Sequence, residues 1–347
     1  MTKERSYYLD IVRILACLMV VVMHSPMPTS GFANAVFLTG LSYFTSPCIG
    51  LFFMTSGALL LPSRLSAKPF LRHRLNKILW PTLCWTFIYI LLNVMRIGES
   101  DISSAYELLR TVFSVPFSAQ GTGVLWFMYT LIGLYLLTPV LSRWLDQATP
   151  REELFYIILG SVTFVYPYLG AIVHINESSS GMLYYFSGYV CYFVLGHYLS
   201  RVLAARSLII SSGIVGLLGA VALVGLKITG CDFDFYTWFW YLTLPVEAMS
   251  VCWFLSIRRF AGFFDALGHR LKDVVSKLSG LSFGVYLCHI AFMRSIFWKI
   301  DAISGISCYV LQTAVIFILS AMSSFLFCYL VARTPLGKYL IGYRIKV

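Results

Sequence analysis

The chain has 347 residues, of which 59% are hydrophobic and only 12% are charged, and its formal net charge is +11. This composition is typical of polytopic membrane proteins and leaves no room for a sizeable soluble domain. The positive charge would also suit a nucleic-acid-binding protein, but the placement of the basic residues argues against that class.

Ten apolar segments are long enough to cross a bilayer as helices, which takes roughly 20 residues. In chain order they cover residues 8–25, 36–61, 78–95, 124–141, 154–172, 181–200, 207–228, 237–257, 280–298 and 306–331. With the N-terminus inside, the Lys and Arg residues fall in inner loops or tails, apart from Arg13 in the first segment and the outer Arg96, Arg110, Lys227, Arg294 and Lys299. This positive-inside pattern predicts an all-α membrane protein with both termini in the cytoplasm, a single domain over residues 1–347 and no nucleic-acid partner.

The nine cysteines lie mostly inside the apolar segments and include no C-x-x-C pair. They are typical of small buried hydrophobic residues, and they indicate neither a disulfide framework nor a zinc site. The sequence therefore predicts no metal cofactor.

Arg13 and His24 lie eleven residues apart in the first segment. On an α-helix, eleven steps of about 100° complete three turns plus about 20°, with a rise of about 16.5 Å, so both side chains face the same way at opposite depths. Ionisable residues in a membrane span are costly and are functional candidates by default. An imidazole is suited to taking a proton from a hydroxyl near neutral pH. The alternatives are a structural hydrogen bond for His24 and a topology anchor for Arg13.

The inner loop over residues 62–77 is the densest cationic stretch of the chain. Its Arg72 and Arg74 suit phosphate because a guanidinium offers paired donors in a planar fork, which predicts a site for a cytosolic polyanion. His197, at the inner end of the sixth segment, could join them around a phosphate. The alternative is that the loop only fixes the topology and contacts anionic lipid headgroups.

Small and aromatic residues mark two further segments. Ser56 and Gly57 interrupt the second segment near its cytoplasmic side, where small residues let a ligand or another helix approach closely. Trp126 opens the fourth segment near the predicted depth of His24, and Tyr129 follows three residues later. These aromatic residues are candidates for stacking against a sugar ring, and the alternative is an aromatic belt. The outer loop over residues 96–123 is expected to cover an outer-facing site.

Glu247 and His289 are expected near mid-membrane, in the eighth and ninth segments, where a charge without a partner is expensive. Glu247 could pair with His289 or Arg294, and a structural pairing is an equal alternative to catalysis. These residues also suit a transporter or flippase of a lipid-linked saccharide with an intramembrane relay. Such proteins often contain repeats, and no convincing repeat is visible in this sequence.

Several short motifs follow one another along nearly the whole chain: Arg13-x10-His24, Phe52 to Gly57, Arg72 with Arg74, Leu125-Trp126-Phe127, Tyr286-Leu287-Cys288-His289 and Pro335 to Lys338. Together they resemble the integral-membrane acyltransferase type 3 family. The chain is most similar to short members that O-acetylate surface polysaccharides or their lipid-linked precursors and lack an extra periplasmic domain.

The resemblance implies a multi-pass enzyme of the bacterial cytoplasmic (inner) membrane, which uses acetyl-CoA or another short acyl donor and a glycan or lipid-linked sugar acceptor. Arg13 would hold the donor, and His24 would act as general base or transient acyl acceptor. The other donor-site candidates are Arg72, Arg74, Ser56, Gly57 and His197. The acceptor-site candidates are Trp126, Tyr129, Glu247, Tyr286 and His289. Membrane lipids are the expected surroundings, and the sequence predicts no particular oligomeric state.

Overall fold

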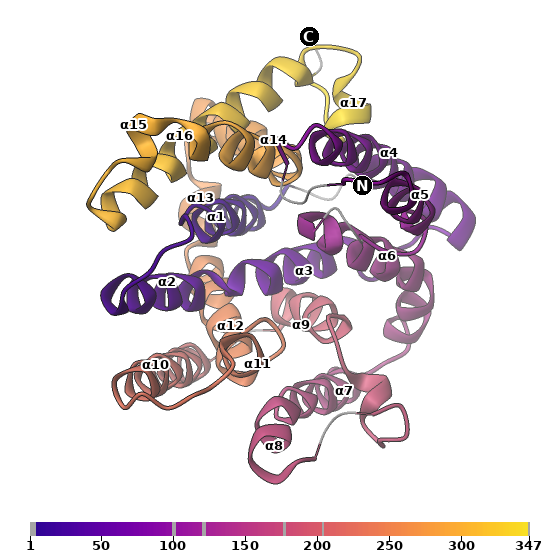
Figure 1. Ribbon diagram of the computed structural model, residues 1–347. Coiled ribbons are helices and arrows are strands. Elements are labelled where there is room, and N and C mark those ends of the chain that lie inside the picture. Colours follow the sequence, from indigo (N-terminus) through magenta and orange to yellow (C-terminus); the bar gives the residue numbers. More distant parts are fainter. Residues whose placement is uncertain (1–4, 99–101, 120–122, 176–177, 203–204, 346–347) are drawn as a thin grey trace. The chain divides into compact units, whose positions relative to one another are not determined.

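The computed structural model describes residues 5–98, 102–119, 123–175, 178–202 and 205–345, and within these ranges the regular elements are all helical (Figure 1). Among the described residues, eight helical segments are long and apolar enough to cross a membrane: Tyr7–His24, Phe32–Leu60, Ala67–Val94, Gly123–Leu145, Pro150–Val173, Arg206–Ile228, His269–Lys299 and Tyr309–Ala332. Helices suit this environment because they satisfy their backbone hydrogen bonds within one segment. The prediction of a polytopic all-α membrane protein is confirmed.

The longer helices are α1 (Tyr7–His24), α2 (Phe32–Thr45), α3 (Pro47–Leu60), α4 (Ala67–Val94), α5 (Ala105–Ser114), α6 (Trp126–Leu145), α7 (Pro150–Thr163), α8 (Tyr166–Val173), α9 (Val190–Arg201), α10 (Arg206–Ile228), α12 (Leu244–Arg259), α14 (His269–Ser295) and α16 (Tyr309–Ala332). The short ones are α11 (Phe235–Trp238), α13 (Ala261–Asp265), α15 (Asp301–Ser304) and α17 (Gly337–Leu340). The described part of the chain also contains the 3-10 turns η1 (Gly123–Leu125), η2 (Tyr184–Phe186) and η3 (Phe297–Lys299).

Two of the ten predicted segments, 181–200 and 237–257, are not among the eight candidate spans of the described residues. Helix α9 has 12 residues and α12 has 16, and a rise of about 1.5 Å per residue makes 12 residues too short for a hydrocarbon layer of about 30 Å. Gly188 has a φ of 88°, which stops the α9 helix from extending toward residue 181. The apolar runs predicted a helix in each of these segments, but both helices begin later and are shorter than the predicted spans.

Helix α4 begins inside the stretch predicted as a cytoplasmic loop, so the loop over residues 62–77 ends at Ser66 and the basic residues after it are helical. Pro69 lies in the first turn, where a backbone N–H has no acceptor within the helix. Lys and Arg are good helix formers, but a search for apolar runs passes over them.

Helix α5 lies within the predicted outer loop, of which residues 99–101 and 120–122 fall outside the described ranges. Ser104 and Glu107 form a capping box that starts this helix. One stripe of α5 consists of exposed apolar side chains, among them Tyr106, Leu109 and Phe113. A short helix with one exposed apolar face is typical of a segment that lies in the membrane interface.

The described chain forms two compact units. Unit 1 contains the described residues of Met1–Met19, Thr29–Arg64 and Thr138–Val275. Unit 2 contains those of Val20–Pro28, Leu65–Leu137 and Ser276–Val347. Helices α1, α6 and α14 each contribute residues to both units.

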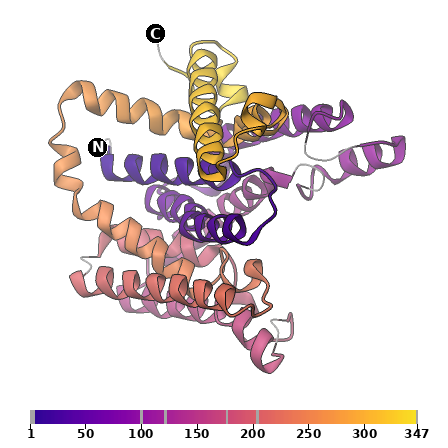
Figure 2. The ribbon, with the colours of Figure 1, turned by 60° about the vertical axis from the view of Figure 1, so that its left-hand side comes forward.

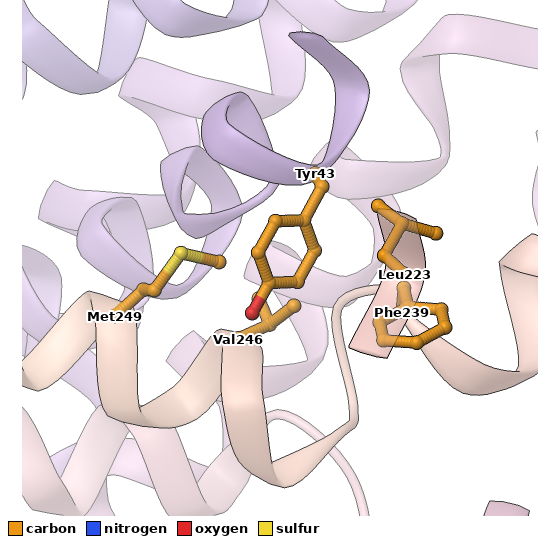
Figure 3. Packing of buried hydrophobic residues seen from close by; sticks show 5 residues of the cluster. All are labelled: Tyr43, Leu223, Phe239, Val246 and Met249. Carbon is orange, nitrogen blue, oxygen red and sulfur yellow. The ribbon is translucent and has the colours of Figure 1, made fainter. Parts of the chain in front are cut away.

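In unit 1, α3 packs along α9, and α12 packs against both α10 and α3 (Figure 1, Figure 2). A hydrophobic cluster holds α2, α10 and α12 together, and it consists of Tyr43, Leu223, Phe239, Val246 and Met249 (Figure 3). The hydroxyl of Tyr43 donates a hydrogen bond of 2.7 Å to the carbonyl oxygen of Gly216 on α10. The buried ring therefore keeps a partner for its polar tip.

In unit 2, two hydrogen bonds tie α4 to the C-terminal part of the chain. Tyr89 donates to the carbonyl oxygen of Leu287 on α14 at 2.8 Å, and Trp85 Nε1 donates to the carbonyl oxygen of Leu340 on α17 at 2.9 Å. The bond from Tyr89 holds the backbone of α14 at Leu287, two residues before His289.

Candidate functional site

Helix α1 carries both Arg13 and His24, so the predicted spacing of these residues along one helix is confirmed. The helix is anchored near its start by Asp10, which is buried and accepts two hydrogen bonds from Arg5, at 2.6 and 3.1 Å. Arg13 and His24 are both half-buried.

His24 is the last residue of α1, and its Nδ1 lies 2.9 Å from the carbonyl oxygen of Val20. A carbonyl oxygen only accepts hydrogen bonds, so Nδ1 carries the proton. In the neutral imidazole Nε2 is then the nitrogen with the lone pair. A basic and nucleophilic nitrogen is therefore held at the end of the first helix.

His289 on α14 repeats this arrangement in unit 2. Its Nδ1 lies 2.7 Å from the carbonyl oxygen of Tyr286, and the side chain is fully buried. Its Nε2 is buried and has no hydrogen-bond partner among the residues that the structure describes. An unsatisfied buried polar atom costs about 1–3 kcal/mol, so this nitrogen is a place where a hydroxyl of a bound molecule would be stabilised.

The two imidazoles are neighbours, with ring centroids 5.3 Å apart and ring planes at 60°. The Arg294 guanidinium on α14 interacts electrostatically with both rings and lies over the Trp298 ring, 5.0 Å from its centroid. Unit 2 thus brings two lone pairs and one positive charge together. A fixed positive charge of this kind can stabilise an oxyanion that develops during acyl transfer.

From the sequence, Arg294 was expected to be an outer basic residue and one possible partner of Glu247. Its place near His24 was not predicted. The available signal was the five-residue separation of His289 and Arg294 on one helix. That separation alone does not show which residues of α1 lie opposite.

Aromatic side chains adjoin the histidines. The Tyr286 ring lies 5.9 Å from that of His289 and 5.2 Å from that of Phe127, and the Trp126 ring lies 6.3 Å from that of Phe127. The Tyr286 hydroxyl donates to the carbonyl oxygen of Val124. Of the predicted acceptor-site residues, unit 2 therefore links Trp126, Tyr286 and His289 in one aromatic row beside His24.

Tyr129 is also in unit 2, and its hydroxyl donates a hydrogen bond of 2.8 Å to the carbonyl oxygen of Val115. Because this hydrogen bond uses the phenolic proton, the Tyr129 hydroxyl is not a donor for an oxyanion. The ring of Tyr129 is the part that could contact a substrate.

The basic end of α4 forms an open pocket of about 520 Å³, lined by Lys68, Pro69, Arg72, His73 and Asn76. Arg74 does not line this pocket. Side chains two residues apart on a helix point in nearly opposite directions. Arg74 is half-buried, and its buried Nε has no hydrogen-bond partner within the described ranges. Of the two arginines, only Arg72 lines this pocket, and a joint action of both on one phosphate stays a hypothesis.

If Arg72 holds a phosphate of the acetyl-CoA donor that the resemblance implies, Arg72→Ala should raise the KM for acetyl-CoA about threefold to tenfold, because an exposed charge–phosphate contact is screened by salt and is worth less than a buried one. The rise should shrink at high ionic strength, and Arg74→Ala should raise the KM less. Arg259, an exposed arginine at the end of α12, supplies the matched control variant Arg259→Ala. Equal effects of the Arg72 and Arg74 variants on the KM would contradict this division of roles between the two arginines.

Gly57 lies where α3 packs on α9 in unit 1, and Ser56 and His197 belong to these two helices. A Cβ on Gly57 would lie 1.7 Å from the carbonyl oxygen of Phe193. A Cβ on Gly196 would likewise lie 2.0 Å from the carbonyl oxygen of Met54. The two glycines therefore allow backbone-to-backbone contact of the two helices, which is the structural alternative for Gly57.

His197 is buried next to this contact and does not lie on a basic surface. Arg201, one turn further along α9, makes an ion pair with the buried Glu153 of α7, with both carboxylate oxygens at 2.6 Å from one guanidinium nitrogen. The charge of Arg201 is thus already neutralised by α7. A shared phosphate site of His197 with the α4 arginines stays a hypothesis.

Glu247 lies near the start of α12 and is buried in unit 1. Its Oε1 accepts a hydrogen bond of 2.7 Å from the Ser161 hydroxyl and a longer contact of 3.7 Å from the Cys191 thiol. These groups satisfy the carboxyl group without a cation. The suggested pairing of Glu247 with His289 or Arg294 stays a hypothesis.

A family model described as an acyltransferase domain matches residues 6–333, which is nearly the whole chain. The matched range contains every candidate site residue. No match to a curated protein or to a solved structure was found.

Proposed function

Because the chain is a multi-pass membrane protein that belongs to this type 3 acyltransferase family, we propose that it moves an acetyl group from acetyl-CoA to a hydroxyl group of a cell-surface polysaccharide or of its lipid-linked precursor. The observation that carries the proposal is the pair of imidazoles His24 and His289 beside Arg294. Two oriented lone pairs with a nearby positive charge suit proton removal from a hydroxyl followed by attack on a carbonyl.

The donor is a cytosolic polyanion, and the basic pocket of α4 would hold its phosphate groups through Lys68 and Arg72. Arg13 would hold the donor nearer to His24. The rise of about 16.5 Å between Arg13 and His24 is comparable to the length of a pantetheine arm, so the thioester can reach His24 while the nucleotide stays on the cytosolic side.

In the reaction, Nε2 of His24 takes the proton from the acceptor hydroxyl, and the hydroxyl oxygen attacks the thioester carbonyl. The C–S bond then breaks, and the coenzyme A thiolate leaves and takes up the proton from the imidazolium. Arg294 stabilises the oxyanion, and Nε2 of His289 accepts a hydrogen bond from a second hydroxyl of the sugar. In the alternative sequence, Nε2 of His24 attacks the thioester first, the C–S bond breaks and the coenzyme A thiolate leaves, so that the imidazole carries the acetyl group. The acceptor hydroxyl then attacks this acetyl group, the N–C bond breaks, and the hydroxyl proton passes to the thiolate.

The enzyme would act in the bacterial cytoplasmic membrane, with the donor inside and the acceptor outside. Sealed vesicles test this arrangement because acetyl-CoA does not cross a bilayer. Inverted vesicles, whose cytosolic face points outward, should incorporate acetyl label from added acetyl-CoA into the glycan fraction. Right-side-out vesicles should do so only after detergent treatment.

The competing function is a transporter or flippase of a lipid-linked saccharide with Glu247 in a relay. Intact saccharide movement without labelled glycan in either type of vesicle would support that function and contradict the acetyltransferase. Incorporation from right-side-out vesicles without detergent would contradict the proposed side of the donor.

A further inference from the structure

Unit 1 contains a second pocket, of about 440 Å³, whose walls include none of the candidate donor-site or acceptor-site residues. It lies at the start of α8, just before α9, and along the segment from α11 to α12. Its walls are mainly aromatic, with side chains from Tyr166, Tyr189, Tyr236, Trp240 and Tyr241. The volume falls within the range of roughly 300–1,000 Å³ that is usual for small-molecule sites.

The aromatic rings of this pocket support one another. Trp240 and Tyr241 have ring centroids 4.4 Å apart, and Tyr236 and Trp240 have centroids 5.0 Å apart. Tyr241 is buried, Trp240 is half-buried and Tyr236 is exposed, so the wall runs from the interior to the surface. A ligand ring could therefore be covered on more than one side.

The segment between α11 and α12 is held in place by hydrogen bonds to its backbone. Tyr192 donates to the carbonyl oxygen of Tyr241, and Tyr168 donates to that of Trp238, both at 2.7 Å. The Phe239 side chain of the same segment is part of the buried cluster in Figure 3. The pocket wall is thus formed before a ligand binds, which reduces the entropy cost of binding.

The polar groups of the pocket are hydroxyls rather than charges. Thr237 donates its proton to the Asp234 carboxylate, and Thr243 donates its proton to the carbonyl oxygen of Trp240 at 2.7 Å. A hydroxyl that donates its proton still has lone pairs that accept hydrogen bonds. The described residues that line the pocket include no Asp, Glu, Lys or Arg.

We propose that this pocket binds a sugar ring of the acceptor glycan. A pyranose has a face of C–H bonds that packs on aromatic rings and a rim of hydroxyls that donate to oxygen acceptors, and this pocket provides both kinds of surface. The inference rests on the proposed function and adds a second place at which the glycan is held.

The test compares pocket variants with a matched control in the acetyl-transfer assay, using de-O-acetylated oligosaccharides released from the surface polysaccharide of the producing cells. Tyr236→Ala and Trp240→Leu should each raise the KM for the oligosaccharide about tenfold, since a stacked ring contributes on this scale. The KM for acetyl-CoA should stay unchanged. The control is Tyr185→Ala, which removes an 80% exposed tyrosine of unit 1 that does not line the pocket.

Binding without turnover separates this inference from the proposed function. The His24→Asn variant, which should not turn over, serves as the reference for binding of the radiolabelled oligosaccharide, and adding Trp240→Leu to it should weaken that binding about tenfold. An unchanged KM and unchanged binding in both pocket variants would overturn the sugar site while leaving acetyl transfer intact. Competition by tetramethylammonium at millimolar concentration, with no competition by the oligosaccharide, would overturn it in favour of an aromatic cage for a cation.

Discussion

His24→Asn should lower kcat/KM for acetyl transfer by about 10²–10⁴-fold, the range expected when a positioned general base is lost. The asparagine amide can donate to the carbonyl oxygen of Val20 as Nδ1 of His24 does, so the end of α1 keeps its hydrogen bond. What the variant lacks is the second nitrogen with its lone pair. The measurement is the rate of label transfer from acetyl-CoA to the glycan fraction in inverted vesicles.

The matched control is His269→Asn, which changes an exposed histidine at the first residue of α14 and should leave the rate unchanged. A His24→Asn rate within a factor of three of the unmodified rate would remove His24 from the chemistry. Incubation with labelled acetyl-CoA without acceptor separates the two reaction sequences. An acetylated protein that forms in the unmodified chain and not in His24→Asn would establish the acyl-imidazole, and its absence would favour direct transfer.

Gly57→Ala should reduce the yield of folded protein severely, because the added Cβ would meet the backbone oxygen of Phe193 at 1.7 Å. A backbone atom cannot rotate away as a side chain can, so α3 and α9 must separate along the contact that Gly57 and Gly196 create. Overpacking of a well-packed interior typically costs 1–3 kcal/mol, and a backbone collision belongs at or beyond the upper end of that range. Thermal unfolding followed by size-exclusion chromatography in detergent measures the effect.

Gly225→Ala on α10 is the control for this substitution, since a Cβ there would meet no described atom within 4 Å. Replacing a helical glycine by alanine without a collision is expected to be neutral or stabilising by up to about 1 kcal/mol. Gly57 was also a donor-site candidate, and the same variant decides between the two roles. Normal stability together with a raised KM for acetyl-CoA would support donor binding and contradict the packing role.

The helical membrane fold was predictable because hydrophobic runs of this length allow few other structures in a bilayer. The helix starts were less predictable. Basic residues extend α4 far beyond its apolar part, and Gly188 with its positive φ delays the start of α9 although the flanking residues are apolar. The length of an apolar run indicates how much of a helix is suited to lipid. Where the helix begins and ends depends on the backbone conformation of the flanking residues.

For the candidate site, the sequence predicted the features that one helix determines and missed those that depend on packing between helices. The spacing of Arg13 and His24 needs only the geometry of α1. The proximity of His24 to His289 joins α1 to α14, and no periodicity in either helix specifies it. The same holds for Arg72 and Arg74, where charge alone suggested a pair and the surroundings of α4 separate them.

The two candidate histidines are oriented in the same way, by backbone atoms of their own helices. Each imidazole is oriented by a carbonyl oxygen of its own helix, Val20 for His24 and Tyr286 for His289, whereas a catalytic triad needs a carboxylate from elsewhere in the chain. The tautomer is thus set by a three- or four-residue stretch of local backbone. Substitutions in the remaining helices can then change the surroundings of the two histidines without disturbing the protonation of either ring. Under the proposed function, the acceptor could therefore change while the two imidazoles keep their roles.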